Sequence, residues 1–340
     1  MKSPYTSMAI VAPPIVVATS TAPASAAPKA PSMGFGFSEG AAMWWLSTSD
    51  LSRELDGVKK TGAKWLRILV DWSKIETSRG SYNWSQLDAM ISAASSRGLT
   101  VLANIMNTPT WARPSGSFLT APPTDDTYLA NFLRAFVGRY FWKVSYYEIW
   151  NEPNLLLFFG GANDPTRYTS MLKTAYTTIK CAQWWGTVIV AGMARSVSGL
   201  SPLTYYQKMY AAGARSYFDA TAMHPYVYPS GISANPENAV SDTLAIRNLM
   251  VAKGDSNKKM WLTEIGAPTL PSVATGVTQT EQANEITSVL ATAADYSWVG
   301  PAFIYSIRDY GTSPTDLEQH FGALYDYDWN IKSTGRALGL

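Results

Sequence analysis

The sequence predicts one α/β domain of the (β/α)8, or TIM-barrel, class, with a short C-terminal extension after the eighth strand. From Met33 onward, β-like runs alternate with amphipathic stretches at roughly 35 residues per unit, which indicates a parallel sheet. An open doubly wound sheet is the alternative, but no glycine-rich phosphate-binding motif follows any predicted strand. Acidic residues also gather where predicted strands end, as reactive groups do in barrel enzymes.

Eight segments are predicted strands because each is a short apolar run with β-branched or aromatic residues. They are 33–37, 65–70, 100–105, 144–150, 187–191, 218–223, 259–263 and 301–306. Amphipathic segments between them are typical of the helices that cover a barrel. These are 51–61, 84–97, 128–140, 165–184, 202–212, 236–253 and 279–296, the fourth of them starting at the helix signal Asp164-Pro165.

The first residues resemble a targeting segment rather than part of the domain. Lys2 precedes a short apolar stretch at 8–18, and Ala24-Ser25-Ala26 has the small residues of a cleavage site. We therefore expect a signal peptide at 1–26, a linker at 27–32 and the barrel at 33–340, in a secreted or cell-envelope protein. The apolar stretch is too short to cross a bilayer, so no membrane segment is expected in the mature chain. A disordered leader is the alternative.

Composition narrows the class of ligand. Of the 340 residues, 15% are charged and 13% are aromatic, and the formal net charge is +2. Nucleic-acid binders normally carry a strong basic excess, so nucleic acid is not an expected partner. Many aromatic faces with few charges suit a neutral, hydroxylated partner such as a sugar.

Two carboxylates lie at the ends of predicted strands. Glu152 follows the fourth predicted strand in the run Trp150-Asn151-Glu152-Pro153-Asn154, and Glu264 ends the seventh in Thr263-Glu264-Ile265-Gly266. In a ring of eight, those strand ends face each other across the barrel mouth. Glycoside hydrolysis needs such a pair, one to protonate the leaving oxygen and one to attack the anomeric carbon or activate water.

These motifs, with others in the same order, resemble the glycoside hydrolases of clan A, most closely family 39 and family 5-like enzymes. The others are Arg67 in Trp-Leu-Arg-Ile-Leu-Val-Asp-Trp, His224-Pro225-Tyr226, Tyr82-Asn83-Trp84 and Thr108-Pro109-Thr110-Trp111. The resemblance covers 33–340. It implies a retaining mechanism without a cofactor, with Glu152 as acid/base and Glu264 as nucleophile. It also implies hydrogen-bonding support from Arg67 and Asn151, the latter meeting the sugar 2-hydroxyl.

Strand periodicity refines these roles. Glu148 is the competing carboxylate, and its parity with Glu152 places it deeper in the barrel, paired with a cation. Asn151 and Glu152 are neighbours and cannot both point inward from a regular strand, so a bulge or sharp turn is expected. Arg67 either forms an ion pair with Asp71 or Glu148, or keeps the nucleophile ionised, and both can hold.

The chain has only two histidines and one cysteine, so no site of several histidines or paired cysteines can bind zinc. We expect His224 to line the sugar site as a hydrogen-bond donor, with a buried core histidine as the alternative. Tyr226 is placed to donate its hydroxyl to Glu264. No role follows for His320.

Aromatic residues near strand ends are candidates for stacking on sugar rings, although any single one is more often part of a core. The candidates are Trp45, Trp72, Trp111 and Tyr305. Many clan members carry a tryptophan at the end of the eighth strand, whereas residues 303–310 of this chain contain none, so the floor of the sugar site departs from the family pattern. The run 155–159 (Leu-Leu-Leu-Phe-Phe) lines a subsite, joins the core or contacts a partner, and the sequence leaves all three open.

The predicted function is a secreted, monomeric, retaining glycoside hydrolase that acts on an oligo- or polysaccharide. A carbohydrate-binding protein that lost turnover is the alternative, and the two intact carboxylates disfavour it. A serine esterase needs G-x-S-x-G, which the sequence lacks.

Overall fold

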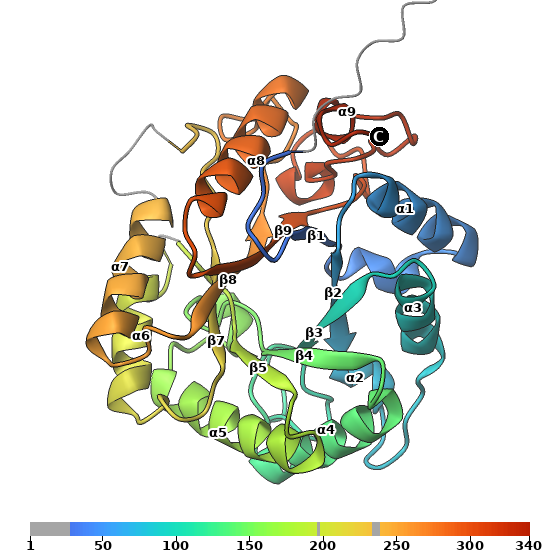
Figure 1. Cartoon of the computed structure of the whole chain (residues 1–340). Helices are drawn as coiled ribbons and strands as arrows, with labels where there is room; N and C mark the ends of the chain where they lie inside the picture. Colours follow the sequence, from blue (N-terminus) through green and yellow to red (C-terminus); the bar gives the residue numbers. More distant parts are fainter. Residues whose placement is uncertain (1–27, 196–197, 233–238) are drawn as a thin grey trace, which may run out of the picture.

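The computed structural model describes residues 28–195, 198–232 and 239–340, so the predicted signal peptide lies outside the described residues. Eight parallel strands form a closed ring surrounded by helices (Figure 1), which confirms the predicted (β/α)8 barrel. The ring consists of β1 (Phe35–Ser38), β2 (Trp65–Asp71), β3 (Thr100–Met106), β4 (Val144–Ile149), β5 (Thr187–Val190), β7 (Ala220–His224), β8 (Lys259–Ile265) and β9 (Val299–Tyr305). Each overlaps a predicted strand.

Neighbouring strands of the ring follow one another in sequence, except where β6 intervenes. The order β5-β4-β3-β2-β1-β9-β8-β7 is closed by a pairing of Ile189 with Ala220. The two-residue β6 (Met193–Ala194) pairs with the end of β7 outside the ring. The sequence did not predict it, because two residues are too few to show an alternating pattern.

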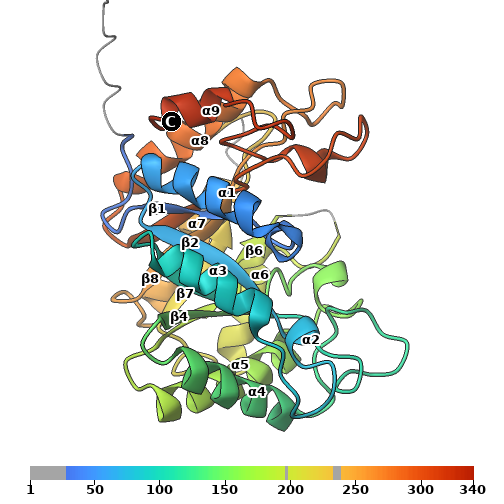
Figure 2. The same ribbon diagram turned by 90° about the vertical axis from the view of Figure 1, so that its right-hand side faces the viewer.

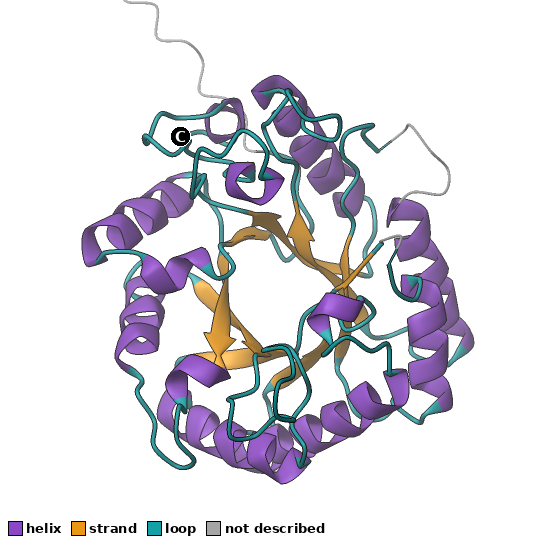
Figure 3. Ribbon diagram, turned by 180° about the vertical axis from the view of Figure 1, so that it is seen from behind, coloured by secondary structure: helices purple, strands orange, loops and turns teal. Residues whose placement is uncertain are grey.

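Helices cover the outside of the ring (Figure 3). They are α1 (Thr48–Lys60), α2 (Trp72–Ile75), α3 (Ser85–Ser95), α4 (Asp126–Tyr140), α5 (Pro165–Ala182), α6 (Pro202–Ala211), α7 (Ala239–Ala252), α8 (Gln279–Ala294) and α9 (Ser333–Ala337). Asp164 caps α5 as predicted, since its side chain accepts a hydrogen bond from the Arg167 amide at 2.8 Å. No helix in the described part of the chain is both long and apolar enough to span a bilayer.

The interior of the ring has two layers that differ in chemistry. An aromatic layer near the N-terminal ends of the strands contains Trp65, Tyr146, Trp261 and Phe303. The ring centroids of Trp65 and Trp261 lie 5.2 Å apart, and Trp261 stacks on Phe303. Two residues further along β2, β3, β4, β7 and β8 the inward side chains become polar. These are Arg67, Asn104, Glu148, His224 and Thr263, all of them buried.

The extension after β9 packs on the barrel near α8. It contains the short helix α9, and Lys332 before it forms a buried ion pair with Asp309 at 3.1 Å. The predicted C-terminal extension is therefore part of the same compact unit.

Candidate active site

A cleft of about 550 Å³ opens at the C-terminal ends of the strands, on the face where the longer loops lie on the right of Figure 2. Its wall includes residues from β2, β8 and β9 and from the loops that follow β3, β4 and β7. Among them are the predicted site residues Arg67, Asn151, Glu152, Tyr226, Glu264 and Tyr305. The cleft is large enough for more than one sugar ring.

The turn after β4 directs Asn151 and Glu152 into this cleft. The backbone is left-handed at Trp150 (φ 77°) and again at Glu152 (φ 43°), which is uncommon outside glycine. The Glu152 amide is held by the Gly192 carbonyl at 3.0 Å. This confirms the predicted sharp turn and explains how two neighbouring side chains face the same space.

A bulge in β8 does the same for Glu264. Between Leu262 and Ile265 the strand gains one residue relative to its partner β9. As a result, Thr263 and Glu264 both face the interior, although a regular strand would point them to opposite sides.

Arg67 links the carboxylates of the polar layer. Its Nε donates to Glu148 at 2.5 Å and its Nη1 to Glu264 at 2.7 Å. Its Nη2 donates to the side-chain oxygen of Asn151 at 2.7 Å. Glu148 thus lies deeper and is paired with a cation, as predicted. Asp71, the other partner considered for Arg67, accepts instead from Asn107 at 3.0 Å.

Glu264 is held as an anion. The Tyr226 hydroxyl donates to its Oε2 at 2.6 Å, as predicted, while Arg67 occupies Oε1. Burial raises the pKa of Glu264, but the charges of His224 and Arg67 and these hydrogen bonds outweigh it, so the pKa lies below its ordinary value.

Glu152 has a different partner. His224 Nδ1 lies 2.7 Å from its Oε1, which leaves Oε2 as the oxygen able to reach a ligand in the cleft. One carboxylate oxygen of Glu152, one of Glu264 and an imidazole nitrogen of His224 lie within 4.8 Å of one another. His224 is fully buried behind the two carboxylates and is not part of the cleft wall. The prediction that it lines the sugar site is corrected: it contacts the acid/base candidate rather than the sugar.

Among the described residues, Glu152, His224 and Glu264 form the one group of possible metal ligands whose donor atoms lie close enough together to share an ion. The donor set fits a metal poorly, because the Arg67 guanidinium lies 2.7 Å from Glu264 and would repel a cation placed there.

The tryptophans predicted to bind sugar lie off the cleft wall. Trp72 is fully buried and stacks on Phe132 with ring centroids 5.4 Å apart, so the prediction for this residue is wrong. Trp111 is partly buried and donates to the Glu76 carbonyl at 2.8 Å. Trp45 is 76% exposed and has Lys74 over its ring. Strand-end position alone did not distinguish these residues from Tyr305, which does line the cleft.

Some residues of the run 155–159 line the cleft and others belong to the core, which are two of the three places considered for it. Leu155 and Phe158 line the cleft, whereas Phe159 is buried in the core and Leu157 is 68% exposed. His320, which had no predicted role, places its Nε2 2.7 Å from the Ser313 carbonyl within the loop after β9.

Several cleft residues were missed by the sequence analysis. They are Asn104, Asn107, Tyr228, Glu318 and Phe321. Asn104 shares inward parity with Leu102, so this signal was available. Glu318 accepts a hydrogen bond from Tyr305, and no local pattern shows that the loop after β9 brings it there.

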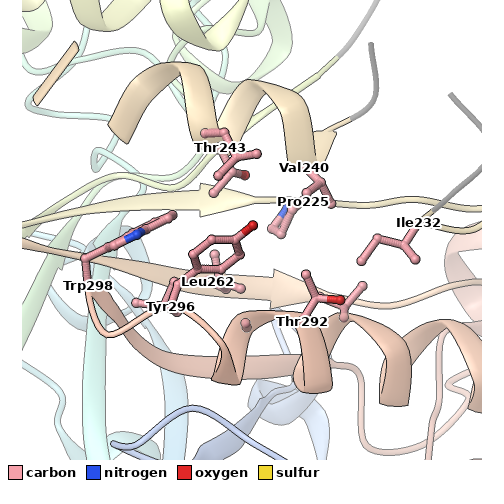
Figure 4. Close-up of a pocket in the computed structure, with 12 residues that line it drawn as sticks. Pro225, Ile232, Val240, Thr243, Leu262, Thr292, Tyr296 and Trp298 are labelled. Carbon is pink, nitrogen blue, oxygen red and sulfur yellow. The ribbon is translucent and has the colours of Figure 1, made fainter. Parts of the chain in front are cut away.

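A second cavity lies between α7 and α8 (Figure 4). Its lining is largely apolar and includes Val240, Leu262, Tyr296 and Trp298. At about 30 Å³ it holds little more than a water molecule, so it is no sugar site.

A (β/α)8 barrel with two carboxylates converging from β4 and β8 is the arrangement found in glycoside hydrolases. The comparison with family models agrees: residues 27–300 match Cellulase (glycosyl hydrolase family 5), and the chain belongs to this family. The resemblance to clan A glycoside hydrolases is thereby confirmed. A comparison with curated proteins finds no match.

Solved structures share the fold. A family 39 glycoside hydrolase from Bacteroides cellulosilyticus is 23% identical with a TM-score of 0.72, the match covering 92% of this chain and 63% of that one. A monomeric β-xylosidase from Caulobacter crescentus is 17% identical (TM-score 0.70, covering 93% and 69%). GH5_18 from Streptomyces cattleya, in complex with GlcNAc, is 18% identical (TM-score 0.66, covering 92% and 79%). The chain thus spans less than two thirds of the length of the family 39 enzyme.

Proposed function

We propose that the protein is a secreted, monomeric, retaining glycoside hydrolase that cleaves O-glycosidic bonds in an oligo- or polysaccharide. The observation that carries this proposal is the approach of Glu152 and Glu264 to within 4.8 Å. Retaining enzymes hold their carboxyl groups about 5 to 5.5 Å apart, whereas inverting enzymes need roughly 6.5 to 9.5 Å to admit a water molecule.

In the first step Glu264 attacks the anomeric carbon and the glycosidic C–O bond breaks. The proton held by Glu152 passes to the leaving oxygen, and a covalent glycosyl–Glu264 ester forms. Arg67 and Tyr226 keep Glu264 ionised, so it is ready to attack. Each donor holds a different oxygen of Glu264, so when one oxygen forms the ester, the donor on the other oxygen keeps its hydrogen bond.

In the second step a water molecule attacks the same carbon. Glu152 takes the proton of this water, the ester bond breaks, and Glu264 leaves as a carboxylate. Two inversions give net retention. The side-chain oxygen of Asn151 is occupied by Arg67, so its amide NH₂ is oriented toward the cleft, where the resemblance places the sugar 2-hydroxyl.

The substrate class rests on the cleft and on the names of similar proteins. The wall combines Tyr228, Tyr305 and Phe321 with amides and carboxylates, which suits a neutral sugar. Cellulase and β-xylosidase act on β-linked sugars, so aryl β-glucosides and β-xylosides are the first substrates to test. Secretion rests on the sequence at 1–26, and mass analysis of the exported chain tests it.

Azide distinguishes the two carboxylates and tests the mechanism. With an activated aryl glycoside, Glu264→Ala should be inactive alone and should give a glycosyl azide of inverted configuration. Glu152→Ala should give an azide of retained configuration, because azide then meets the covalent intermediate. NMR of the first-formed anomer from the unaltered enzyme should show retention. Inversion there would contradict the mechanism, and binding without turnover would favour the carbohydrate-binding alternative.

A further inference from the structure

Behind the two carboxylates, a buried chain of hydrogen bonds runs from the acid/base candidate to the interior of the barrel. His224 Nδ1 meets Glu152 at 2.7 Å, and His224 Nε2 meets the Thr263 hydroxyl at 3.0 Å. That hydroxyl donates to Glu148 Oε1 at 2.8 Å. Thr263, Glu148 and His224 are all fully buried, so the protein itself must satisfy these groups.

The Glu148 carboxylate can only accept. Its Oε2 receives Arg67 Nε at 2.5 Å and Asn104 Nδ2 at 3.2 Å, and its Oε1 receives the Gly192 amide at 2.9 Å. The Thr263 hydroxyl has a single proton, and that proton is directed at Glu148. Toward His224, the Thr263 oxygen is therefore an acceptor, and Nε2 of the imidazole must carry a hydrogen.

We propose that Thr263 and Glu148 are positioning residues that fix His224 with a hydrogen on Nε2, so that Glu152 and His224 share one proton and work as a pair. This proposal rests on the function proposed above for Glu152. With Nε2 always protonated, the 2.7 Å contact between Nδ1 and Glu152 contains one proton, from an imidazolium or from a carboxylic acid.

The fixed tautomer has a consequence for the reaction. When the shared proton passes to the leaving oxygen and the glycosidic C–O bond breaks, neutral His224 presents a lone pair to the Glu152 carboxylate. A neutral imidazole of the other tautomer would instead donate Nδ1–H and stabilise the anion. Without that hydrogen bond, the proton released when water attacks the glycosyl–Glu264 ester returns more readily to the pair of Glu152 and His224.

The charges around the pair favour keeping its proton. Burial lowers the pKa of His224, but the negative charges of Glu264 and Glu152 raise it above its ordinary value, against the opposing charge of Arg67. Among the described residues, the titratable and charged groups that face the pair are Glu264 from β8, Arg67 from β2, Glu148 from β4, Tyr226 and Tyr228 after β7, and Glu318 from the loop after β9. The variants proposed below alter none of them.

The tautomer is directly measurable, because the chain has only two histidines. Imidazole ¹⁵N NMR on untagged protein, at a pH high enough for the His224 ring to be neutral, should show that ring protonated at Nε2 and not at Nδ1. His320→Gln assigns the signal. A ring protonated at Nδ1 in the unaltered chain overturns the proposal, and this measurement stands even if the protein hydrolyses no glycoside.

Thr263→Val removes the hydroxyl oxygen that accepts from His224 Nε2, and Thr263→Ser retains it. In Thr263→Val the neutral ring should shift toward Nδ1–H, and the basic limb of kcat/KM should move to lower pH. At pH values above that limb, each variant's rate is expressed as a fraction of its own maximum. This fraction should be about tenfold lower in Thr263→Val than in Thr263→Ser, because a factor of ten corresponds to the loss of about one charge-assisted hydrogen bond. A basic limb and tautomer equal in both variants overturn the proposal. If Thr263→Val does not fold, the NMR spectrum of Thr263→Ser and the unaltered chain decides.

Discussion

The aromatic layer and the polar layer inside the barrel are built on the same strands, yet different interactions hold them together. In β8, Trp261 belongs to the aromatic layer and Thr263, two residues later, to the polar layer. In β2 the same change separates Trp65 from Arg67. The aromatic layer is held by shape and apolar burial, and the polar layer by charge pairing and hydrogen-bond direction.

Because of this difference, substitutions in the two layers should change different measured properties. Removing an apolar side chain leaves a cavity, whose cost appears in the free energy of unfolding. Removing a polar side chain changes the charge or the protonation of the groups it contacted. That change appears in the reaction rate and in its pH dependence. Exchanging residues in each layer should therefore separate stability from catalysis.

The largest effect is expected from Glu264→Gln in the polar layer. The amide cannot attack the anomeric carbon, so kcat should fall on the order of 10⁴-fold or more. Thermal unfolding should change little, because the amide keeps the shape of the side chain and Arg67 keeps its ion pair with Glu148. Steady-state kinetics on an aryl glycoside measures the loss. Glu285→Gln is the matched control, since it makes the same exchange in α8 and should leave kcat unaltered.

The next effect is expected from Trp261→Ala in the aromatic layer. Loss of a buried indole should lower the free energy of unfolding by about 3 to 5 kcal/mol. The folded fraction should keep a kcat close to that of the unaltered chain, which urea unfolding and kinetics at low temperature can check together. Trp261→Phe should cost less. A variant that unfolds normally but loses turnover would contradict the division between the layers.

A smaller effect, visible in the pH profile, is expected from Arg67→Lys. Lysine keeps the charge but cannot reach Glu148, Glu264 and Asn151 together as the guanidinium does. Because Arg67 lowers the pKa of Glu264, its replacement should raise that pKa. The acid limb of kcat/KM, which follows ionisation of the nucleophile, should then move to higher pH. An acid limb that stays in place would show that Tyr226 and His224 suffice.

The smallest effect concerns Glu285, a buried carboxylate that forms no ion pair with any of the residues the structure describes. Burial raises the pKa of Glu285 to about 7, and its Oε2 has no hydrogen-bond partner within the described part of the chain. Between the ordinary value of 4.5 and about 7 the folded state binds a proton that the unfolded state has lost, so stability falls as pH rises through this range. Glu285→Gln should add about 1 to 3 kcal/mol at pH 8 and little at pH 4. Thermal unfolding at both pH values measures it.

The sequence predicted the barrel because eight apolar strands and their covering helices carry strong periodic signals. It placed Glu152 and Glu264 at strand ends for the same reason, and parity placed Glu148 below them. It did not predict that Thr263 and Glu264 face inward together, because a bulge has no signature in residue type.

Other parts of the site depend on long-range packing. Glu318 reaches the cleft from a loop far along the chain, and the burial of Trp72 depends on Phe132 in α4. Neither follows from a window of neighbouring residues. His224 was recognised, but its place behind the carboxylates required the distances.

Gly192 matters to this network although it has no side chain. A Cβ there would lie 2.0 Å from His224 Nε2 and 2.6 Å from the Thr263 hydroxyl, in the space their hydrogen bond occupies. Its amide and carbonyl also hold Glu148 and Glu152. A mutational survey that truncates side chains to alanine would rank this position as empty, whereas here alanine is the disruptive residue. Libraries for altering the specificity of this protein should therefore keep position 192 constant while varying the loops around the cleft.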